Sequence, residues 1–368
     1  MKVALLSDCY PPRTGGIESQ VGDLAAQLAR RGHDVEVLTA TPGSGGERDG
    51  AVEIVDGVRV HRLAVRFSGE IPVNPLASSP ARRILGDGGF DVAHGHLGVV
   101  SPFGWDMARV ATTLGLPTAL TFHCVLDGAA PALGPPLRTW TRRGAVLSAV
   151  SGLAAKGVQR ALPGEPVALL PNGIDPRAWP VGEVRRHARP LRVVTAARLA
   201  PRKRVGPLLR VVARAVDRLG PSALTVDVYG DGPLRGLLEH RAESMGLGGV
   251  VTFRGRVHRP ALARAYRGAD AYLSPTRLEA FGIAALEART AGLPVVARAD
   301  SGVGEVVRHG SSGLLAADDD GLADALVRLV GDETLRRRIA DHVVRTPPVQ
   351  TWDRVVDLAV REYRRAGA

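Results

Sequence analysis

The sequence contains only two cysteines, Cys9 and Cys124, in 368 residues. Two thiols without metal-ligand spacing exclude a disulfide framework and give no support to a zinc site. No apolar run reaches the length that a transmembrane helix needs. The opening residues, MKVALLSD, have the pattern of a buried strand rather than that of a signal peptide. We therefore expect a cytoplasmic protein.

The composition of the chain is typical of a soluble α/β protein. Apolar residues make up 45% of the sequence, the mean hydropathy is +0.03, and short apolar strands alternate with amphipathic helices. A chain of 368 residues is too long for one compact core. We therefore expect two domains.

Positive charge exceeds negative charge by 11 at pH 7. Such an excess implies an anionic partner, which leaves open a nucleotide, a membrane surface and a nucleic acid. Most arginines are scattered, and two clusters lie in the N-terminal half: Arg59, Arg62 and Arg66 with Arg82 and Arg83, and then Arg138, Arg142 and Arg143. These clusters are either anion-binding surfaces or ordinary solvated side chains.

The first 40 residues have the pattern of a strand, a helix and a second strand. Residues 3–7 and 35–39 are apolar enough for buried strands, and apolar residues recur at helical spacing over 17–28. Gly15 and Gly16 lie at the entrance to the helix, where the backbone can approach a diphosphate closely. The full spacing of a dinucleotide fingerprint is absent, so the two glycines alone are a weak indication.

The stretch 274–315 combines two carboxylates, a helix start and two turns. An apolar strand over 271–273 is followed by a turn containing Glu279 and Gly282, and then by a helix that carries Glu287. The free N–H groups at the start of this helix favour a phosphate. Carboxylates cannot bind phosphate, but they accept hydrogen bonds from the hydroxyls of ribose and hexose rings. Each glutamate alone could equally be a solvated surface residue.

At these residues the chain resembles the retaining family 4 glycosyltransferases, whose Glu-x7-Glu signature is matched by Glu279 and Glu287. Ser274-Pro275 and the segments 292–296 and 313–315 also fit that pattern. Within the family the chain looks most like phosphatidylinositol mannosyltransferases and inositol-phosphate glycosyltransferases. The resemblance implies the GT-B architecture, in which two facing Rossmann-like domains enclose a cleft. The nucleotide sugar would bind mainly to the C-terminal domain and the hydroxyl acceptor, a lipid or a small molecule, to the N-terminal one.

The resemblance also implies domain boundaries and a mechanism. The acceptor-side domain would span 1–178, with the terminal helix 350–368 packed back on it, and the donor-binding domain would span 179–349, after a linker at 180–190. Transfer would retain the anomeric configuration without a metal or other cofactor. No covalent nucleophile is assigned, because the leaving phosphate itself would help to deprotonate the acceptor hydroxyl.

Individual roles follow residue by residue from the same resemblance. Arg198, Lys203, Gly16 and the helix start at Phe281-Gly282 would hold the diphosphate. Glu279 would bind the donor sugar, Glu287 the ribose, and the backbone at Val257 the edge of the nucleobase. The segment after Val257 offers His258 and Arg259 rather than the carboxylate that guanine favours. Arg202 and Arg204 are expected at the surface.

Three features of the N-terminal half are candidates for the acceptor side. His123 follows a strand over 117–122, where open parallel sheets place ligands. The resemblance implies that it is a catalytic residue beside the donor sugar, at the acceptor face; the alternative is a core histidine. Residues 125–140 are rich in glycine and proline, which predicts an irregular acceptor loop. The stretch 71–74, Ile-Pro-Val-Asn, is similar to one near the acceptor of phosphatidylinositol mannosyltransferases.

His94 and His96 lie on one side of a predicted strand, so a metal site is conceivable there. No third ligand lies nearby in sequence, which argues against it.

The sequence is also compatible with other functions. A sugar-nucleotide epimerase could share the architecture, and a nucleic-acid-binding protein would explain the charge, although no reading motif is present. The turn 230–233, Gly-Asp-Gly-Pro, lacks the third glycine of a nicotinamide-binding fingerprint. We therefore expect no nucleic acid as partner. From the resemblance and the positive charge we expect a nucleotide sugar as donor and peripheral contact with the inner face of an anionic membrane.

Overall fold

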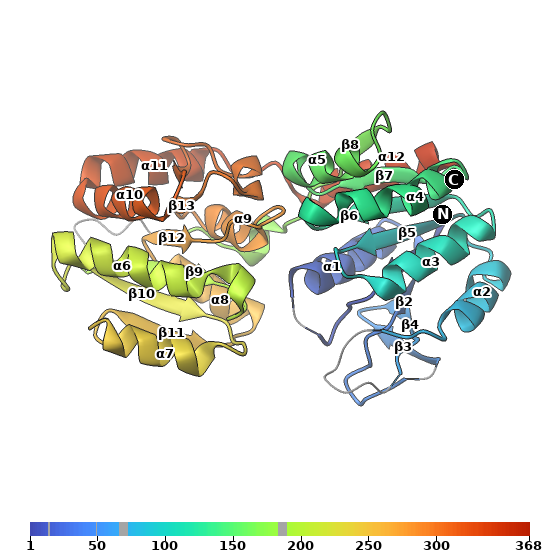
Figure 1. Cartoon of the computed structure of the whole chain (residues 1–368), viewed down its shortest axis with the longest axis horizontal. Helices are drawn as coiled ribbons and strands as arrows, with labels where there is room; N and C mark the ends of the chain where they lie inside the picture. The colour runs from blue at the N-terminus through green and yellow to red at the C-terminus, as the bar shows by residue number, and fades with distance from the viewer. Residues whose placement is uncertain (14, 49, 66–72, 183–189) are drawn as a thin grey trace. The chain divides into compact units, whose positions relative to one another are not determined.

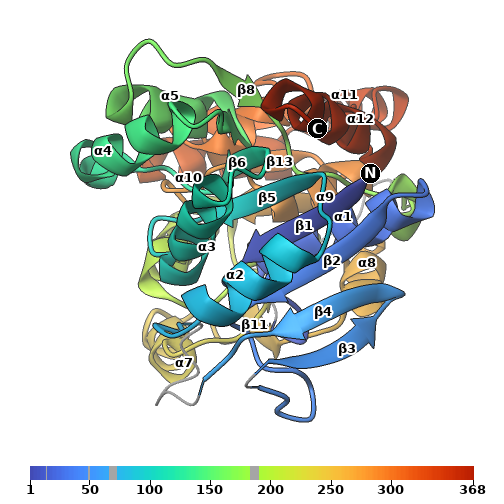
Figure 2. The ribbon, with the colours of Figure 1, turned by 90° about the vertical axis from the view of Figure 1, so that its right-hand side faces the viewer.

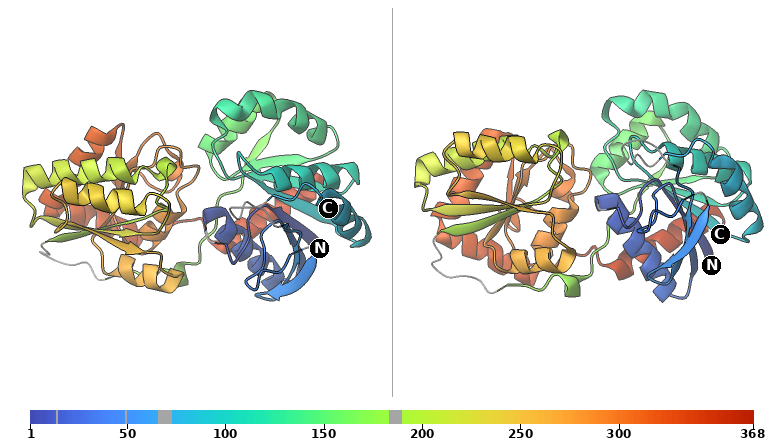
Figure 3. Two further views of the ribbon diagram at one scale, coloured as in Figure 1. Left: turned by 60° about the horizontal axis from the view of Figure 1, so that its bottom comes forward. Right: turned by 90° about the horizontal axis from the view of Figure 1, so that it is seen from below.

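The computed structural model describes residues 1–13, 15–48, 50–65, 73–182 and 190–368. These residues form two units (Figure 1): unit 1 comprises Met1–Gly173 and Trp352–Ala368, and unit 2 comprises Ile174–Thr351. Each unit has a mainly parallel sheet with helices on both faces (Figure 3). Arg66, the first two residues of the stretch 71–74 and most of the expected linker lie outside the described residues.

In unit 1 the described residues form an eight-stranded sheet in the order β3-β4-β2-β1-β5-β6-β7-β8. Its strands are β1 (Lys2–Ser7), β2 (Asp34–Thr39), β3 (Ala51–Val55), β4 (Val58–Arg62), β5 (Val92–Leu97), β6 (Thr118–Phe122), β7 (Val146–Ala149) and β8 (Val167–Leu169). β3 pairs antiparallel with β4, and the other pairings in this part of the chain are parallel. The strand order reverses between β1 and β5, which is where open parallel sheets bind ligands, outside the carboxyl ends of the strands.

The helices of unit 1 are α1 (Gly16–Arg30), α2 (Ser78–Asp87), α3 (Pro102–Thr113), α4 (Ala130–Thr141), α5 (Gly152–Ala161) and α12 (Trp352–Ala366), with a 3₁₀ turn at η1 (Asp127–Ala129). α3 packs against β1 and β5, and α2 packs against α3 (Figure 2). The C-terminal α12, red in Figure 1, lies against β5, β6 and β7. Trp352, Val356 and Tyr363 of α12 share a core with Val3 and Leu5 of β1, so the end of the chain belongs to unit 1.

In unit 2 the described residues form a six-stranded parallel sheet in the order β11-β10-β9-β12-β13-β14. Its strands are β9 (Leu191–Ala196), β10 (Leu224–Tyr229), β11 (Val251–Gly255), β12 (Ala271–Ser274), β13 (Val295–Arg298) and β14 (Gly313–Ala316). The helices are α6 (Val205–Leu219), α7 (Arg235–Ser244), α8 (Arg259–Arg267), α9 (Ile283–Thr290), α10 (Asp319–Gly331) and α11 (Glu333–Arg345), with 3₁₀ turns η2 (Pro176–Ala178), η3 (Pro201–Lys203) and η4 (Gly302–Glu305). Here the strand order reverses between β9 and β12.

Apolar residues recur at helical spacing in the helices of unit 2, so each helix has an apolar face that packs into the core. Leu208 and Val212 of α6 and Leu322, Leu326 and Leu329 of α10 are buried together against the sheet. Burying each of these side chains stabilises the fold by about 1.5–3 kcal/mol. Among the helices of the described residues, none combines the length and apolar composition that crossing a membrane requires.

The prediction of an irregular segment at 125–140 is wrong, because α4 occupies most of it. Pro135 and Pro136 lie inside this helix and remove backbone donors. Tertiary packing outweighs that loss, since Leu137 and Trp140 are buried. Gly134 lets the helix approach α5 closely: a Cβ atom there would lie 2.6 Å from the carbonyl oxygen of Ala161.

Candidate active site

The carboxyl ends of β9 and β12 bring two candidate donor-binding residues together. Lys203 lies in the segment after β9, and Glu279 lies in the loop after β12. The hydroxyl of Thr276 donates to the carbonyl oxygen of Lys203 at 3.3 Å, and Lys203 Nζ lies 2.7 Å from Glu279 Oε2. The Lys203 and Glu279 side chains are 34% and 22% exposed, so both remain accessible to a ligand.

Helix α9 begins at the same edge without a side-chain cap. Its N-cap, Gly282, has φ of 89° and ψ of 56°, and a Cβ atom there would lie 2.7 Å from Cγ2 of Val303. The left-handed backbone and the close contact both require glycine. No acidic residue lies in the first turn, so its free N–H groups and the positive end of the helix dipole can serve an anion. Phe281 is buried, so its ring packs in the interior.

Glu287 lies in the second turn of α9 and is half-buried. Both glutamates affect the pKa of the buried Tyr272 phenol, on β12. Burial raises the pKa of Tyr272, the negative charge of Glu279 raises it further, and Glu287 adds a smaller increase. The phenol donates to the carbonyl oxygen of Ala196, at the end of β9, at 3.4 Å. Both glutamates therefore lie within electrostatic reach of the Tyr272 phenol.

Arg198 and Val257 are the other expected donor-binding residues of unit 2. Arg198 is exposed directly after β9, and none of the described residues forms a hydrogen bond or ion pair with its guanidinium. It is therefore available to an anionic ligand. Val257 is half-buried after β11, which lies two strands from β9, at about 5 Å per strand.

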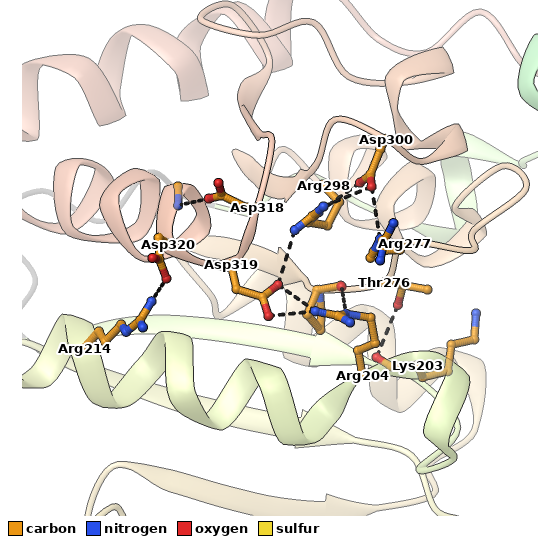
Figure 4. Close-up of polar contacts among 12 residues, drawn as sticks. Lys203, Arg204, Arg214, Thr276, Arg277, Arg298, Asp300, Asp318, Asp319 and Asp320 are labelled. Atoms are coloured by element: carbon orange, nitrogen blue, oxygen red, sulfur yellow. Dashed lines mark hydrogen bonds and ion pairs between the residues drawn. The ribbon is translucent and has the colours of Figure 1, made fainter.

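The expectation that Arg204 is a surface residue is wrong (Figure 4). Its Nη2 donates to both carboxylate oxygens of Asp319, at 2.8 and 2.7 Å, and its Nε donates to the carbonyl oxygen of Pro275 at 3.2 Å. Asp319 also pairs with Arg298 Nη1 at 3.4 Å. The sequence could not reveal this contact, because Asp319 is 115 residues away. Arg202 is exposed, as expected.

In unit 1 three histidines lie side by side: His94 and His96 on β5, and His123 directly after β6. The Nε2 atom of His123 lies 3.0 Å from Nδ1 of His96, and the ring centroids of His96 and His94 are 4.1 Å apart. Burial lowers the pKa of His123 to about 4. Burial and the neighbouring His123 lower the pKa of His94 to about 3. At pH 7 His123 is therefore a neutral imidazole that can form hydrogen bonds but carries no charge.

The possible metal site at His94 and His96 gains no support from this cluster. In the part of the chain that the structure describes, no three His, Cys, Asp or Glu side chains are arranged to hold a metal ion. His94 instead contacts Thr121 Oγ1 at 2.7 Å and the hydroxyl of Tyr363 at 2.9 Å. The sequence did not predict the contact of His96 with His123, because this contact depends on β5 and β6 being neighbours in the sheet.

Gly16 is the first residue of α1 and is exposed. The carboxylate of Glu18 turns back against Gly15 at this helix start. Arg13 Nε lies 3.2 Å from Glu18 Oε1 and offsets part of its charge. The helix start that the resemblance assigns to the diphosphate therefore already has an acidic neighbour.

Asp8, directly after β1, is a buried residue that the sequence analysis did not single out. Its carboxylate accepts hydrogen bonds from the backbone N–H groups of Phe103 and Gly104, both at 3.0 Å. Burial raises the pKa of Asp8 to about 6. The contact fixes the loop after β1 to the start of α3. An acidic residue directly after a buried strand is the signal that could have drawn attention to it.

The arginine clusters differ in their exposure. Arg62 is only 1% exposed and forms an ion pair with Glu53, and Arg59 lies 3.5 Å from Glu36. The interpretation of Arg62 as part of a basic surface is therefore wrong. The remaining described members are exposed on α2 and at the end of α4: Arg82, Arg83, Arg138, Arg142 and Arg143.

The lowered pKa values of His94, His96 and His123 predict that acid destabilises unit 1. A histidine whose folded pKa is about 4 and whose unfolded pKa is about 6.5 binds its proton only on unfolding, so stability falls as the pH drops from 6.5 towards 4. At pH 5 the loss is about 2 kcal/mol for His123. Asp8 acts in the opposite direction, because its raised pKa makes the folded state bind its proton first as the pH falls below 6.

Three histidines with lowered pKa values, of which His94 and His96 are buried and His123 is half-buried, outweigh one aspartate, so we expect unit 1 to unfold at a lower temperature at pH 5 than at pH 7.5. Calorimetry at the two pH values measures this. His94→Gln should reduce the pH dependence, and His240→Gln, at an exposed position, should leave it unchanged. A midpoint that does not respond to pH would contradict this account of the cluster.

Two described protein families match the two halves of the chain. Residues 14–178 match the family described as Glycosyltransferase Family 4, and residues 183–343 match that described as Glycosyl transferases group 1. A D-inositol 3-phosphate glycosyltransferase of Actinosynnema mirum is 31% identical over 96% of this chain and 92% of its own length. A GDP-mannose-dependent alpha-mannosyltransferase of Mycolicibacterium smegmatis is 30% identical over 99% of this chain and 97% of its own.

Solved structures share the fold. The crystal structure of WaaG, a glycosyltransferase involved in lipopolysaccharide biosynthesis, matches with a TM-score of 0.75, 19% identity and complete coverage of both chains. At that identity the likeness establishes the fold, and it confirms the GT-B class that the resemblance implies. The chain belongs to the family 4 glycosyltransferases and is a glycosyltransferase.

Proposed function

We propose that the chain is a retaining hexosyltransferase that moves a hexose from a nucleoside diphosphate sugar, linked to UDP or GDP, to a hydroxyl acceptor. The observation that supports this most is the pairing of Lys203 with Glu279 beside the uncapped start of α9, at the strand reversal of unit 2. A cation and free helix N–H groups suit a diphosphate, and the adjacent carboxylate suits sugar hydroxyls.

The proposed roles follow from charge. Lys203 and Arg198 neutralise the negative charge that develops on the leaving diphosphate, together with the N–H groups at the start of α9. Glu279 then accepts hydrogen bonds from the donor sugar, and Glu287 accepts them from the ribose. His123 acts as a neutral hydrogen-bonding group beside the sugar, and a leaving-phosphate oxygen takes the proton of the acceptor hydroxyl.

A thermal-shift screen with UDP-, GDP- and ADP-linked sugars tests the proposed donor class. A donor present at 100 times its dissociation constant stabilises the folded state by about 2.7 kcal/mol. The GDP-mannose dependence of the mannosyltransferase relative argues for GDP, whereas His258 and Arg259 stand after Val257 in place of the carboxylate that guanine favours, which argues against it. Transfer should require an acceptor; conversion of the sugar with donor alone would indicate an epimerase instead.

We expect EDTA to leave turnover unchanged, because cationic side chains and helix N–H groups supply the charge stabilisation in the proposed mechanism. Turnover is measured as release of nucleoside diphosphate with and without EDTA. Complete loss of activity that a divalent ion restores would show that the metal-free mechanism is wrong.

For the acceptor we propose an inositol-type hydroxyl, either on a small phosphate or on a lipid. An inositol 3-phosphate glycosyltransferase is among the relatives, and exposed arginines on α2 and α4 provide cations for an anionic acceptor or membrane. We also propose that the protein is cytoplasmic and contacts the membrane peripherally. Each arginine near an anionic leaflet contributes about 1 kcal/mol, so binding should be weak and salt-sensitive.

Liposome sedimentation distinguishes the two acceptors. We expect wild-type protein to sediment with anionic vesicles at low salt, less so at high salt, and less again when Arg82 and Arg83 are replaced by serine. Arg361→Ser and Arg364→Ser, at exposed positions of α12, serve as the matched control. No sedimentation at low salt would rule out the lipid acceptor.

A further inference from the structure

Arg204 occupies an unusual backbone position between the 3₁₀ turn η3 and helix α6. Its φ is 56° and its ψ is 33°, the left-handed region that favours glycine. Among the described non-glycine residues, Asp56 is the other one with a positive φ. A strained residue in a fold needs surrounding contacts that hold it in place. The side chain of Arg204 makes such contacts.

The contacts of Arg204 reach two other segments of unit 2. Its guanidinium binds both oxygens of Asp319, at the start of α10, and the carbonyl oxygen of Pro275, in the loop after β12. The Arg204 side chain is 27% exposed and that of Asp319 24%, so this ion pair is partly shielded from water. The guanidinium is thereby committed to the protein rather than to a ligand.

A charged chain continues this network behind the site (Figure 4). Asp319 is shared with Arg298, which is 7% exposed on its side chain and pairs with Asp300 at 2.9 Å. Asp300 in turn pairs with Arg277, two residues before Glu279, at 3.1 Å. The Asp300 pairing raises the pKa of Arg298, so this guanidinium stays charged. The segments after β9, β12 and β13 are thus tied to the start of α10.

We propose that Arg204 is a positioning residue that sets the geometry of Lys203 and Glu279. Arg204 directly follows Lys203 in sequence, and the carbonyl it binds, that of Pro275, is four residues before Glu279. The hydroxyl of Thr276, 3% exposed, makes a parallel contact with the carbonyl oxygen of Lys203. Arg204 therefore fixes the spacing between Lys203, which we propose binds the diphosphate, and Glu279, which we propose binds the sugar. This inference rests on the function proposed above.

Arg204→Gly is the decisive variant, because glycine adopts the left-handed backbone without strain while the side-chain contacts disappear. We expect its unfolding temperature to stay near that of the wild type and its kcat to fall between about tenfold and 10²-fold, with a smaller change in KM for the donor. UDP-glucose and GDP-mannose are the first probes. Arg204→Lys keeps the charge but has one nitrogen, which cannot bind Asp319 and the carbonyl oxygen of Pro275 as Nη2 and Nε of Arg204 do, so it should restore only part of kcat.

Arg214→Ala is the matched control. Arg214 forms an ion pair with Asp320 and so joins the same two helices, α6 and α10, without contacting either loop of the site (Figure 4). We expect this variant to keep the wild-type kcat. In the Lys203→Ala background, Arg204→Gly should lower kcat by less than it does in the wild type, because part of its effect passes through Lys203. A kcat of Arg204→Gly within twofold of wild type, or fully additive effects, would overturn the proposal.

A crystal structure of ligand-free Arg204→Gly tests the inference without any substrate. We expect the 2.7 Å contact between Lys203 Nζ and Glu279 Oε2 to be lost or to occupy more than one position. An unchanged contact would overturn the positioning role. Failure of the wild-type chain to bind or turn over any nucleotide sugar would instead contradict the proposed function, so the two failures are distinguishable.

Discussion

Lys203→Ala is expected to lower turnover by about 10²-fold or more, as the loss of a group that stabilises transition-state charge does in other enzymes. The ammonium of Lys203 lies at the carboxyl edge of the unit 2 sheet and is held there by Glu279. In the proposed reaction it meets the diphosphate as the bond to the sugar breaks. The binding of substrate before reaction should change less than turnover, because negative charge on the diphosphate grows in the transition state.

Steady-state kinetics with the best donor measures this effect. Arg202→Ala is the matched control, since Arg202 is a cation in the same 3₁₀ turn but is exposed. It should retain near-normal turnover. Near-normal turnover in Lys203→Ala as well would remove Lys203 from the mechanism.

Glu279→Ala and Glu287→Ala are expected to fail at different steps. Loss of Glu287 removes a charged hydrogen-bond acceptor from the ribose, so the dissociation constant of the nucleoside diphosphate should rise about tenfold or more. Loss of Glu279 releases Lys203 from its ion pair, so affinity for the nucleoside diphosphate should be kept or increase. Transfer should nevertheless slow, because the donor sugar loses its acceptor group.

Isothermal titration with UDP and GDP, paired with turnover measurements, separates these outcomes. Glu243→Ala, an exposed carboxylate on α7, is the control for a general change in charge. Equal nucleotide affinity in the Glu279 and Glu287 variants would count against the two separate roles.

The local sequence pattern predicted most of the secondary structure around the candidate site of unit 2. The strand over 271–273, the turn at Gly282 and the helix after it appear as β12, the left-handed N-cap and α9. These features depend on near neighbours in sequence: apolar runs, glycine conformation and helical spacing. The placement of Lys203 beside Glu279 needed more, because the two are 76 residues apart and meet only when β9 and β12 become adjacent strands.

The wrong predictions have a common physical origin. Proline disfavours the interior of a helix, which led to the prediction of a loop at α4. A charged arginine is usually exposed to solvent, which led to the prediction that Arg204 lies at the surface. Tertiary contacts override both: Leu137 and Trp140 bury one face of α4, and Asp319 pairs with Arg204. Partners distant in sequence decided these cases, and a single sequence does not reveal such partners.

The most direct test of the proposed donor site is a crystal structure of the chain with UDP or GDP, whichever stabilises it more. The account predicts that the terminal phosphate binds between Lys203 Nζ and the first N–H groups of α9, with Lys203 turned from Glu279 towards the phosphate. A nucleoside diphosphate bound elsewhere on the chain, with the 2.7 Å contact between Lys203 and Glu279 intact, would contradict it.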